Sequence, residues 1–119
     1  MNVMLKRAYE EPGMGDGYRV LVDRLWPRGL SKANARIDLW LKEVAPSTEL
    51  RKWFAHDPQK WTEFTRRYRL ELKGNPAWPE LQAIARQKAL TLVYAAKDEV
   101  HNEAVVLRRL LDDEPKQAR

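Results

Sequence analysis

Two runs of consecutive apolar residues interrupt a chain that otherwise mixes polar and apolar positions. One opens the Val20–Leu25 segment inside the stretch Tyr18–Leu30, and the other fills Leu90–Ala96. Neighbouring side chains of a strand point to opposite faces, so a strand that is apolar at successive positions must be covered on both faces. The pattern predicts that both segments are buried strands in the middle of an α/β sheet.

A further apolar segment, Val3–Tyr9, predicts a strand at the start of the chain. It is followed by the loop Glu10–Gly17, which contains a proline and three glycines. This loop is short for a parallel crossover, which usually needs about a dozen residues. A hairpin between the first two strands therefore remains an alternative.

Apolar residues at three- and four-residue steps predict the helices that cover the sheet. Ser47 and Asp57-Pro58 are N-terminal signals for two of them, and Asp98 is the expected N-cap of the last. Another helix is expected to begin at Pro79. The clearest buried stripe follows Pro58 and consists of Trp61, Phe64, Tyr68 and Leu72.

The order of strand, strand, helices, strand and helix predicts a small α/β sandwich. A length of 119 residues fits one domain, which we expect to span residues 1–119. The polar end of the chain, residues 114–119, is expected to be a disordered tail.

Composition excludes several classes of protein. The chain has no cysteine, which excludes disulfides, thiolate metal sites and cysteine nucleophiles and is typical of a cytoplasmic protein, the location that we expect. The first residues become charged too soon for a signal peptide, and no window approaches a membrane span. The net charge of +5 arises from 22 basic and 17 acidic residues and indicates weak attraction to anions.

Candidate site residues follow the two buried strands. Ligands of open α/β folds bind at the carboxyl ends of the strands, and the polar residues there include several cations beside an aromatic ring. Such groups suit a phosphorylated or nucleotide-like anion. If the strands are parallel neighbours, one rim carries Arg24, Trp26, Arg28, Lys97, Asp98, His101 and Asn102. The structural alternative is that Arg24 neutralises Asp23 or Glu43 and that Trp26 belongs to the core.

Asp98 and His101 are the candidate catalytic pair. They are three residues apart, close enough to hydrogen-bond, and a carboxylate–imidazole pair can act as a general base. The alternative is local bonding at a helix end, where the Asp98 carboxylate would occupy the backbone donors and leave anion binding to Arg24, Arg28 and Lys97. His56 is interpreted as structural.

No motif for a metal, a phosphate-binding glycine loop or a serine nucleophile is present, so no metal ligand is assigned, and the sequence leaves the cofactor and the metal content undetermined. A second function remains open: Arg66, Arg67 and Arg69 form a basic helical face that could bind nucleic acid or a protein partner. The sequence predicts no membrane partner and leaves the oligomeric state undetermined.

Several strings resemble the YeaO-like branch of the domain-of-unknown-function 488 family, over nearly the whole chain. They are Arg19–Gly29, Leu39–Phe54, His56-Asp57-Pro58, and Leu92–Asp98 with His101-Asn102. The resemblance implies an α/β fold with a mostly parallel sheet, for which the apolar segments predict about three strands with helices packed on them. It thus favours Val20–Leu25 and Leu90–Ala96 as parallel neighbours, and it implies no established activity.

Other branches of that family resemble a pattern with one cysteine near the end of the last strand and a Cys-His-Arg string at the next helix. Here the matching positions are Tyr94 and His101-Asn102. The resemblance therefore does not extend any thiol or metal chemistry of those branches to this chain. It implies a shared location for the site, which is weaker than a shared mechanism.

Overall fold

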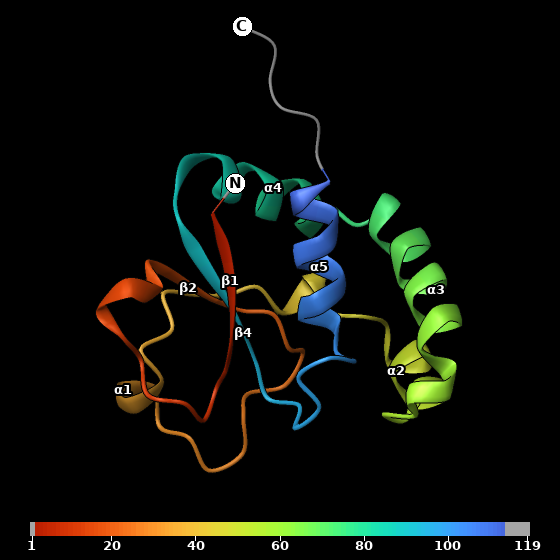
Figure 1. The fold of residues 1–119 in the computed structure, drawn as a ribbon, viewed down its shortest axis with the longest axis horizontal. Helices are drawn as coiled ribbons and strands as arrows, with labels where there is room; N and C mark the ends of the chain where they lie inside the picture. Colours follow the sequence, from red (N-terminus) through yellow and green to blue (C-terminus); the bar gives the residue numbers. More distant parts are fainter. Residues whose placement is uncertain (1, 114–119) are drawn as a thin grey trace, which may run out of the picture.

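The computed structural model describes residues 2–113, which form a four-stranded parallel sheet with helices packed on it (Figure 1). The strands are β1 (Val3–Arg7), β2 (Tyr18–Leu21), β3 (Leu39–Trp40) and β4 (Leu90–Tyr94). Their order across the sheet is β1-β4-β2-β3, and every neighbouring pair is parallel. The α/β fold is confirmed, with β3 added to the three strands expected. The tail expected at 114–119 lies outside the described residues.

The two buried strands are parallel neighbours, as predicted, and β4 lies between β1 and β2. Val20 pairs with Leu92, and both are fully buried. Because β1 and β2 do not pair with each other, the hairpin alternative is wrong. The expected strand Val20–Leu25 was too long, since β2 ends at Leu21 and Leu25 is 63% exposed.

The helices are α1 (Lys32–Ala35), α2 (Thr48–Phe54), α3 (Trp61–Lys73), α4 (Ala77–Gln87) and α5 (Glu103–Asp112). Short 3-10 turns lie at Met14–Asp16, Lys42–Val44 and Pro58–Lys60. The predicted N-terminal signals are confirmed at Ser47, whose hydroxyl accepts from the Leu50 N–H, and at Asp57, whose carboxylate accepts from the Gln59 N–H. None of the helices in residues 2–113 combines the length and apolar character that crossing a bilayer requires.

The two faces of the sheet are covered differently. Side chains of alternate strand residues, such as Val20 and Leu92, pack with α2, α3, α4 and α5 in the main core. On the other face, Leu21 and Val93 pack with Ala8 under the connecting loops. Figure 1 shows the same division, with α1 and the red-to-orange connection on one side of the sheet and α2, α3 and α5 on the other.

The connection between β1 and β2 returns along the sheet without a helix of its own. It ends at Gly17, whose positive φ of 65° and close approach to the Ala89 carbonyl leave no room for a side chain. An extended chain of this length easily spans a short strand, at roughly 3.3 Å per residue. A parallel crossover therefore needs no helix here.

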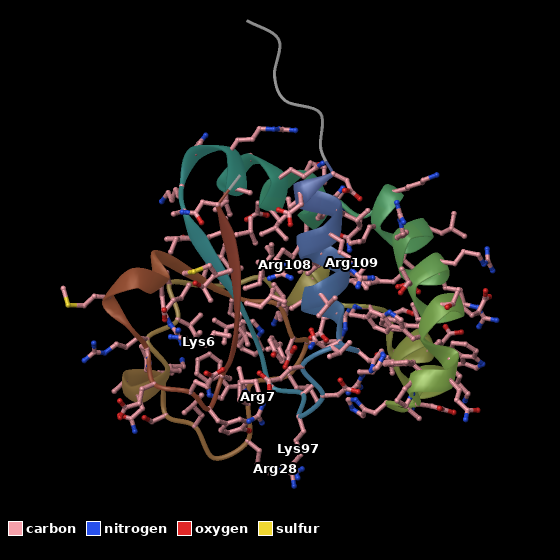
Figure 2. The ribbon with its side chains drawn as sticks, viewed as in Figure 1. Lys6, Arg7, Arg28, Lys97, Arg108 and Arg109 are labelled. Atoms are coloured by element: carbon pink, nitrogen blue, oxygen red, sulfur yellow. The ribbon has the colours of Figure 1, made fainter. Side chains whose placement is uncertain are left out.

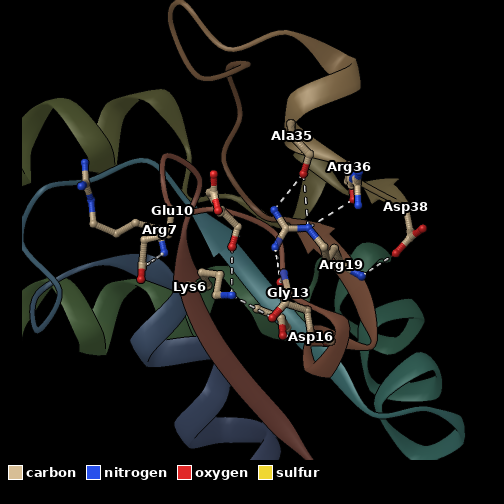
Figure 3. Close-up of polar contacts among 11 residues, drawn as sticks. Lys6, Arg7, Glu10, Gly13, Asp16, Arg19, Ala35, Arg36 and Asp38 are labelled. Carbon is tan, nitrogen blue, oxygen red and sulfur yellow. Dashed lines mark hydrogen bonds and ion pairs between the residues drawn. The ribbon is translucent and has the colours of Figure 1, made fainter.

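A buried ion pair fixes this connection to the sheet (Figure 3). The Asp16 carboxylate accepts from Arg19 Nη1 at 2.6 Å and from Lys6 Nζ at 2.8 Å, and Asp16 is only 5% exposed. Arg19 Nη2 also donates to the Ala35 carbonyl at 2.8 Å, and the Thr91 hydroxyl donates to the Asp16 carbonyl at 2.7 Å. The network thus joins β1, β2, β4 and α1.

Asp16 is expected to make the stability of the fold depend on acid pH. Burial raises the pKa of Asp16, but hydrogen bonds from Lys6, the Gly13 N–H and Arg19 outweigh it and lower the pKa from 3.8 to about 2. A carboxylate with a lowered folded-state pKa stabilises the fold above its unfolded-state pKa, and this stabilisation is lost as the pH falls through 2. Urea titrations between pH 4 and pH 2 should show a smaller pH dependence for Asp16→Asn than for the parent chain. Equal pH dependence would contradict the assignment.

Candidate functional site

A cavity of about 630 Å³ opens at the carboxyl ends of β2 and β4. The strands are parallel neighbours, so the residues that follow them emerge at the same edge of the sheet. All seven side chains that the sequence predicted for a site line this cavity: Arg24, Trp26, Arg28, Lys97, Asp98, His101 and Asn102. The structure therefore brings together groups from two segments that are far apart in the sequence.

Hydrogen bonds from side chains to the backbone hold the segment after β4 in place. The Asp23 carboxylate accepts from the Ala95 N–H at 2.9 Å and so joins the ends of the two strands. Arg7, the last residue of β1, donates from Nε to the Ala96 carbonyl at 2.9 Å and from Nη2 to the Ala95 carbonyl at 3.4 Å. These contacts fix the backbone from which Lys97 extends.

Arg28 and Lys97 are exposed cations of the cavity, as is Arg51 of α2. Figure 2 shows the Arg28 and Lys97 side chains extending outward at the same end of the molecule. Neither side chain has a hydrogen-bond or ion-pair partner within residues 2–113. The Tyr9 hydroxyl donates to the Arg28 carbonyl at 2.9 Å and anchors the backbone below the Arg28 side chain.

Arg24 has a structural role, but its partners are backbone carbonyls and not the acidic side chains considered for it. Its Nη2 donates to the carbonyls of Ala45 and Pro46, each at 3.3 Å, instead of pairing with Asp23 or Glu43. Its Nε is buried and lacks a partner among the described residues. The guanidinium therefore supports the segment before α2, and its Nε stays buried and unsatisfied.

Trp26 lines the cavity and also packs in the core. The indole is half-buried, and its Nε1 donates to the Leu30 carbonyl at 2.6 Å. Its ring meets Trp40 edge to face with the centroids 5.5 Å apart, and it packs against the smaller core cluster of Leu21 and Val93. One indole thus belongs to both the core and the cavity lining.

The expected helix cap at Asp98 was wrong. Asn102 caps α5, because its side-chain oxygen accepts from the Val105 N–H at 3.2 Å. Asp98 instead closes the preceding turn by accepting from the N–H groups of Val100 and His101 at 2.9 and 3.0 Å. The helix begins later than expected because residues 98–101 form a turn of their own.

The hydrogen bond expected between Asp98 and His101 is present, at 2.9 Å between Oδ2 and Nδ1. This bond lowers the pKa of Asp98 to about 2, with further contributions from the N–H groups of Val100 and His101. When Nδ1 carries the shared proton, Nε2 has a free lone pair. The edge-to-face contact of the imidazole with Trp61, at 5.2 Å between centroids, further restrains the ring.

Sequence reasoning missed several residues of the cavity. Arg51, His56 and Glu103 also line it, as does Asp23, which was expected at this edge of the sheet but was given no role in ligand binding. Burial raises the pKa of Glu103 well above its usual value, and the hydrogen-bonded Asp23 carboxylate raises it further. The signal for Asp23 was its place at the end of a buried strand, whereas nothing local to Glu103 indicates that it meets a residue so distant in the sequence.

His56 was interpreted as structural, yet it also lines the cavity. Both it and Ala55 adopt left-handed backbone conformations, with φ of 57° and 48°. Such conformations are uncommon for residues other than glycine and are enriched at functional sites. The tight turn directs the chain from α2 toward Asp57, which caps the next 3-10 turn.

The basic helical face is partly neutralised. Arg66 Nε and Nη2 both donate to the Glu63 carboxylate at 2.8 Å, and Arg67 Nε donates to it at 2.7 Å. These hydrogen bonds lower the pKa of Glu63 to about 2. Arg69, in contrast, has no side-chain partner in the described part of the chain.

Comparisons with known proteins identify the family. A family model described as the inactive DUF488-N3 subclade matches residues 2–119. The chain belongs to this family. It is 44% identical to the uncharacterised protein YeaO of Escherichia coli over 108 residues, which cover 90% of this chain and 94% of that protein. No solved structure matches.

Another protein similar to this chain is an uncharacterised protein of Mycobacterium tuberculosis, strain H37Rv. It is 42% identical over 110 residues, which cover 92% of this chain and 93% of the relative. Tyr94 occupies the position that was matched to a strand-end cysteine of other branches. Its side chain is buried, and burial raises the pKa of its phenol. Within residues 2–113, no three histidine or acidic side chains lie together in a group that could hold a metal ion.

Proposed function

We propose that this domain binds a small anionic ligand, nucleotide-like or phosphorylated, in the cavity at the carboxyl ends of β2 and β4. The observation that carries the proposal is the convergence of Arg28 and Lys97 at one cavity, each without a partner in residues 2–113. A volume of about 630 Å³ is in the usual range for small-molecule sites.

The polarity of the cavity orients such a ligand. Asp23 and Glu103 are acidic side chains that share a hydrogen bond in the cavity lining. A phosphate beside them is disfavoured, because it would be repelled by the negative charge of the pair. Arg28 and Lys97 are exposed, whereas the third exposed cation, Arg51, is close enough to Glu103 to lower the pKa of that carboxyl, so the anionic group binds to Arg28 and Lys97. The aromatic and aliphatic lining, which includes Trp26, Phe54 and Pro46, takes the apolar body of the ligand.

Neutral substitutions of the exposed cations test the proposal. Arg28→Gln and Lys97→Gln should each weaken binding by roughly 1.5–3 kcal/mol, the range for hydrogen bonds to charged groups. Because both side chains are exposed, the melting temperature should not change. Calorimetric titration with nucleotides and phosphorylated metabolites measures the effect, and Lys32→Gln, on an exposed residue of α1, is the matched control.

Binding that survives both substitutions, or a screen without any ligand, would reject the anion site. Arg24→Gln is a less specific test, because it also removes the hydrogen bonds to the Ala45 and Pro46 carbonyls. We expect this variant to lose thermal stability as well as ligand affinity.

A second candidate function is general-base catalysis by His101, and the hydrogen bond to Asp98 favours it. The bond would hold the imidazole with Nε2 free to accept a proton from a bound molecule. The description of the family as inactive favours binding without turnover. Product analysis of each ligand from the screen, with the parent chain and with His101→Gln, distinguishes the two: catalysis requires a product that the variant does not form.

A further inference from the structure

A second concavity, separate from the cavity described above, lies between α3 and α5. Its volume is about 610 Å³, and most of its lining comes from α3, with Arg109 contributed by α5. Figure 2 shows Arg109 on α5, which stands next to α3 in Figure 1. We call this concavity the α3–α5 groove and define it by Trp61, Thr65, Arg66, Arg69, Lys73 and Arg109.

The groove has a strong excess of positive charge. Arg66 is bound to Glu63, but Arg69, Lys73 and Arg109 are exposed and have no side-chain partner within residues 2–113. No carboxylate of the described chain lines the groove. Unpaired cations that share one concave surface repel one another, and an anionic partner relieves this repulsion.

Hydroxyl and aromatic groups accompany these cations. Thr62 is exposed in the lining, whereas the Thr65 hydroxyl is buried and lacks a hydrogen-bond partner among the described residues. Trp61 is half-buried at one end of α3, where it contributes an aromatic surface to the groove. Phosphate oxygens accept hydrogen bonds from hydroxyls and cations, while a base can stack on an indole.

We propose that the α3–α5 groove binds single-stranded nucleic acid through its phosphate backbone. An acidic amphipathic helix is the competing partner, but such a helix needs a continuous apolar stripe to bury its own. The apolar lining here is confined to Trp61 and Leu70, nine positions apart on α3, and only Leu70 is largely exposed, at 52%. Charge without a continuous apolar stripe fits a phosphate backbone better than a helix.

Fluorescence anisotropy with a labelled 15-nucleotide oligo(dT) tests the proposal. The triple variant Arg69→Gln/Lys73→Gln/Arg109→Gln should bind at least tenfold more weakly at 50 mM salt. Each phosphate contact to a single strand contributes about 0.7 to the slope of log affinity against log salt, so the slope should fall in magnitude by about 2. All three side chains are exposed, and a thermal melt checks that the fold is retained.

The control carries the same charge change elsewhere. Lys32→Gln/Arg36→Gln/Lys52→Gln removes three exposed cations that lie outside the groove and should lower the affinity less than threefold. Equal losses in the two triple variants would show that only net charge matters and would overturn the proposal. Absence of oligo(dT) binding at 50 mM salt would overturn it as well, as would equally tight binding of a polyglutamate peptide of the same charge.

Discussion

Replacing Phe64 by alanine is expected to lower the free energy of unfolding by roughly 3–5 kcal/mol, because it leaves a cavity among aromatic rings. Phe64 is 2% exposed on α3 and stacks on Phe54 of α2, with centroids 4.3 Å apart. Trp61 and Tyr68 contact the same ring at 5.7 Å each. Urea denaturation followed by circular dichroism measures the loss.

The matched control for Phe64→Ala lies on the same helix. Leu70 is 52% exposed, so Leu70→Ala removes little buried surface and should cost less than about 1 kcal/mol. Comparable losses for the two variants would mean that helix propensity, and not the packing of α2 on α3, determines the effect. Because Phe64 also lines the cavity, a ligand from the binding screen should stabilise the parent chain more than Phe64→Ala.

Replacing Arg19 by methionine should destabilise the fold by roughly 3–5 kcal/mol, the cost of removing one partner from a buried ion pair. Arg19 is 3% exposed, and its guanidinium donates to the Asp16 carboxylate and to the Ala35 carbonyl. Methionine fills part of the space but donates no hydrogen bond. Lys6 remains as a partner of Asp16, so the loss should lie toward the lower end of the range.

Arg36→Met is the control for Arg19→Met. The Arg36 side chain is exposed, and only its backbone carbonyl accepts from Arg19, so the substitution should change stability by less than about 0.5 kcal/mol. The double variant Asp16→Asn/Arg19→Met gives the coupling energy between the two residues. Additive losses would show that Asp16 is satisfied by Lys6 alone.

The main elements of the fold could be predicted because their signals are local. Consecutive apolar residues at Val20 and Leu90 indicated strands buried on both faces, and the Phe64 stripe indicated a helix with one buried side. Ser47 and Asp57 were recognised as caps because a cap bonds a backbone group only two or three residues away. Asp98 was misread because its turn uses the same short-range bonds as a helix start.

The site was only partly predictable. Ligands of open α/β sheets bind at the carboxyl ends of the strands. This general rule placed Arg28, Lys97 and His101 at the edge where the cavity lies. It could not identify Glu103 or His56, because their presence depends on how α5 and the turn after α2 pack against the strands. Nor could it show that Arg24 bonds backbone carbonyls instead of a carboxylate.

The sequence by itself determined most of the strands and helices, though not β3, because burial periodicity and capping act over a few residues. Only the tertiary structure decided that β4 separates β1 from β2, that Asp16 and Arg19 form a buried pair with Lys6, and that Asp23 bonds the Ala95 N–H across 72 positions. These contacts depend on the register and order of parallel strands, and these in turn depend on the whole core. A local pattern can therefore predict the elements, but the distances within a site are set by long-range packing.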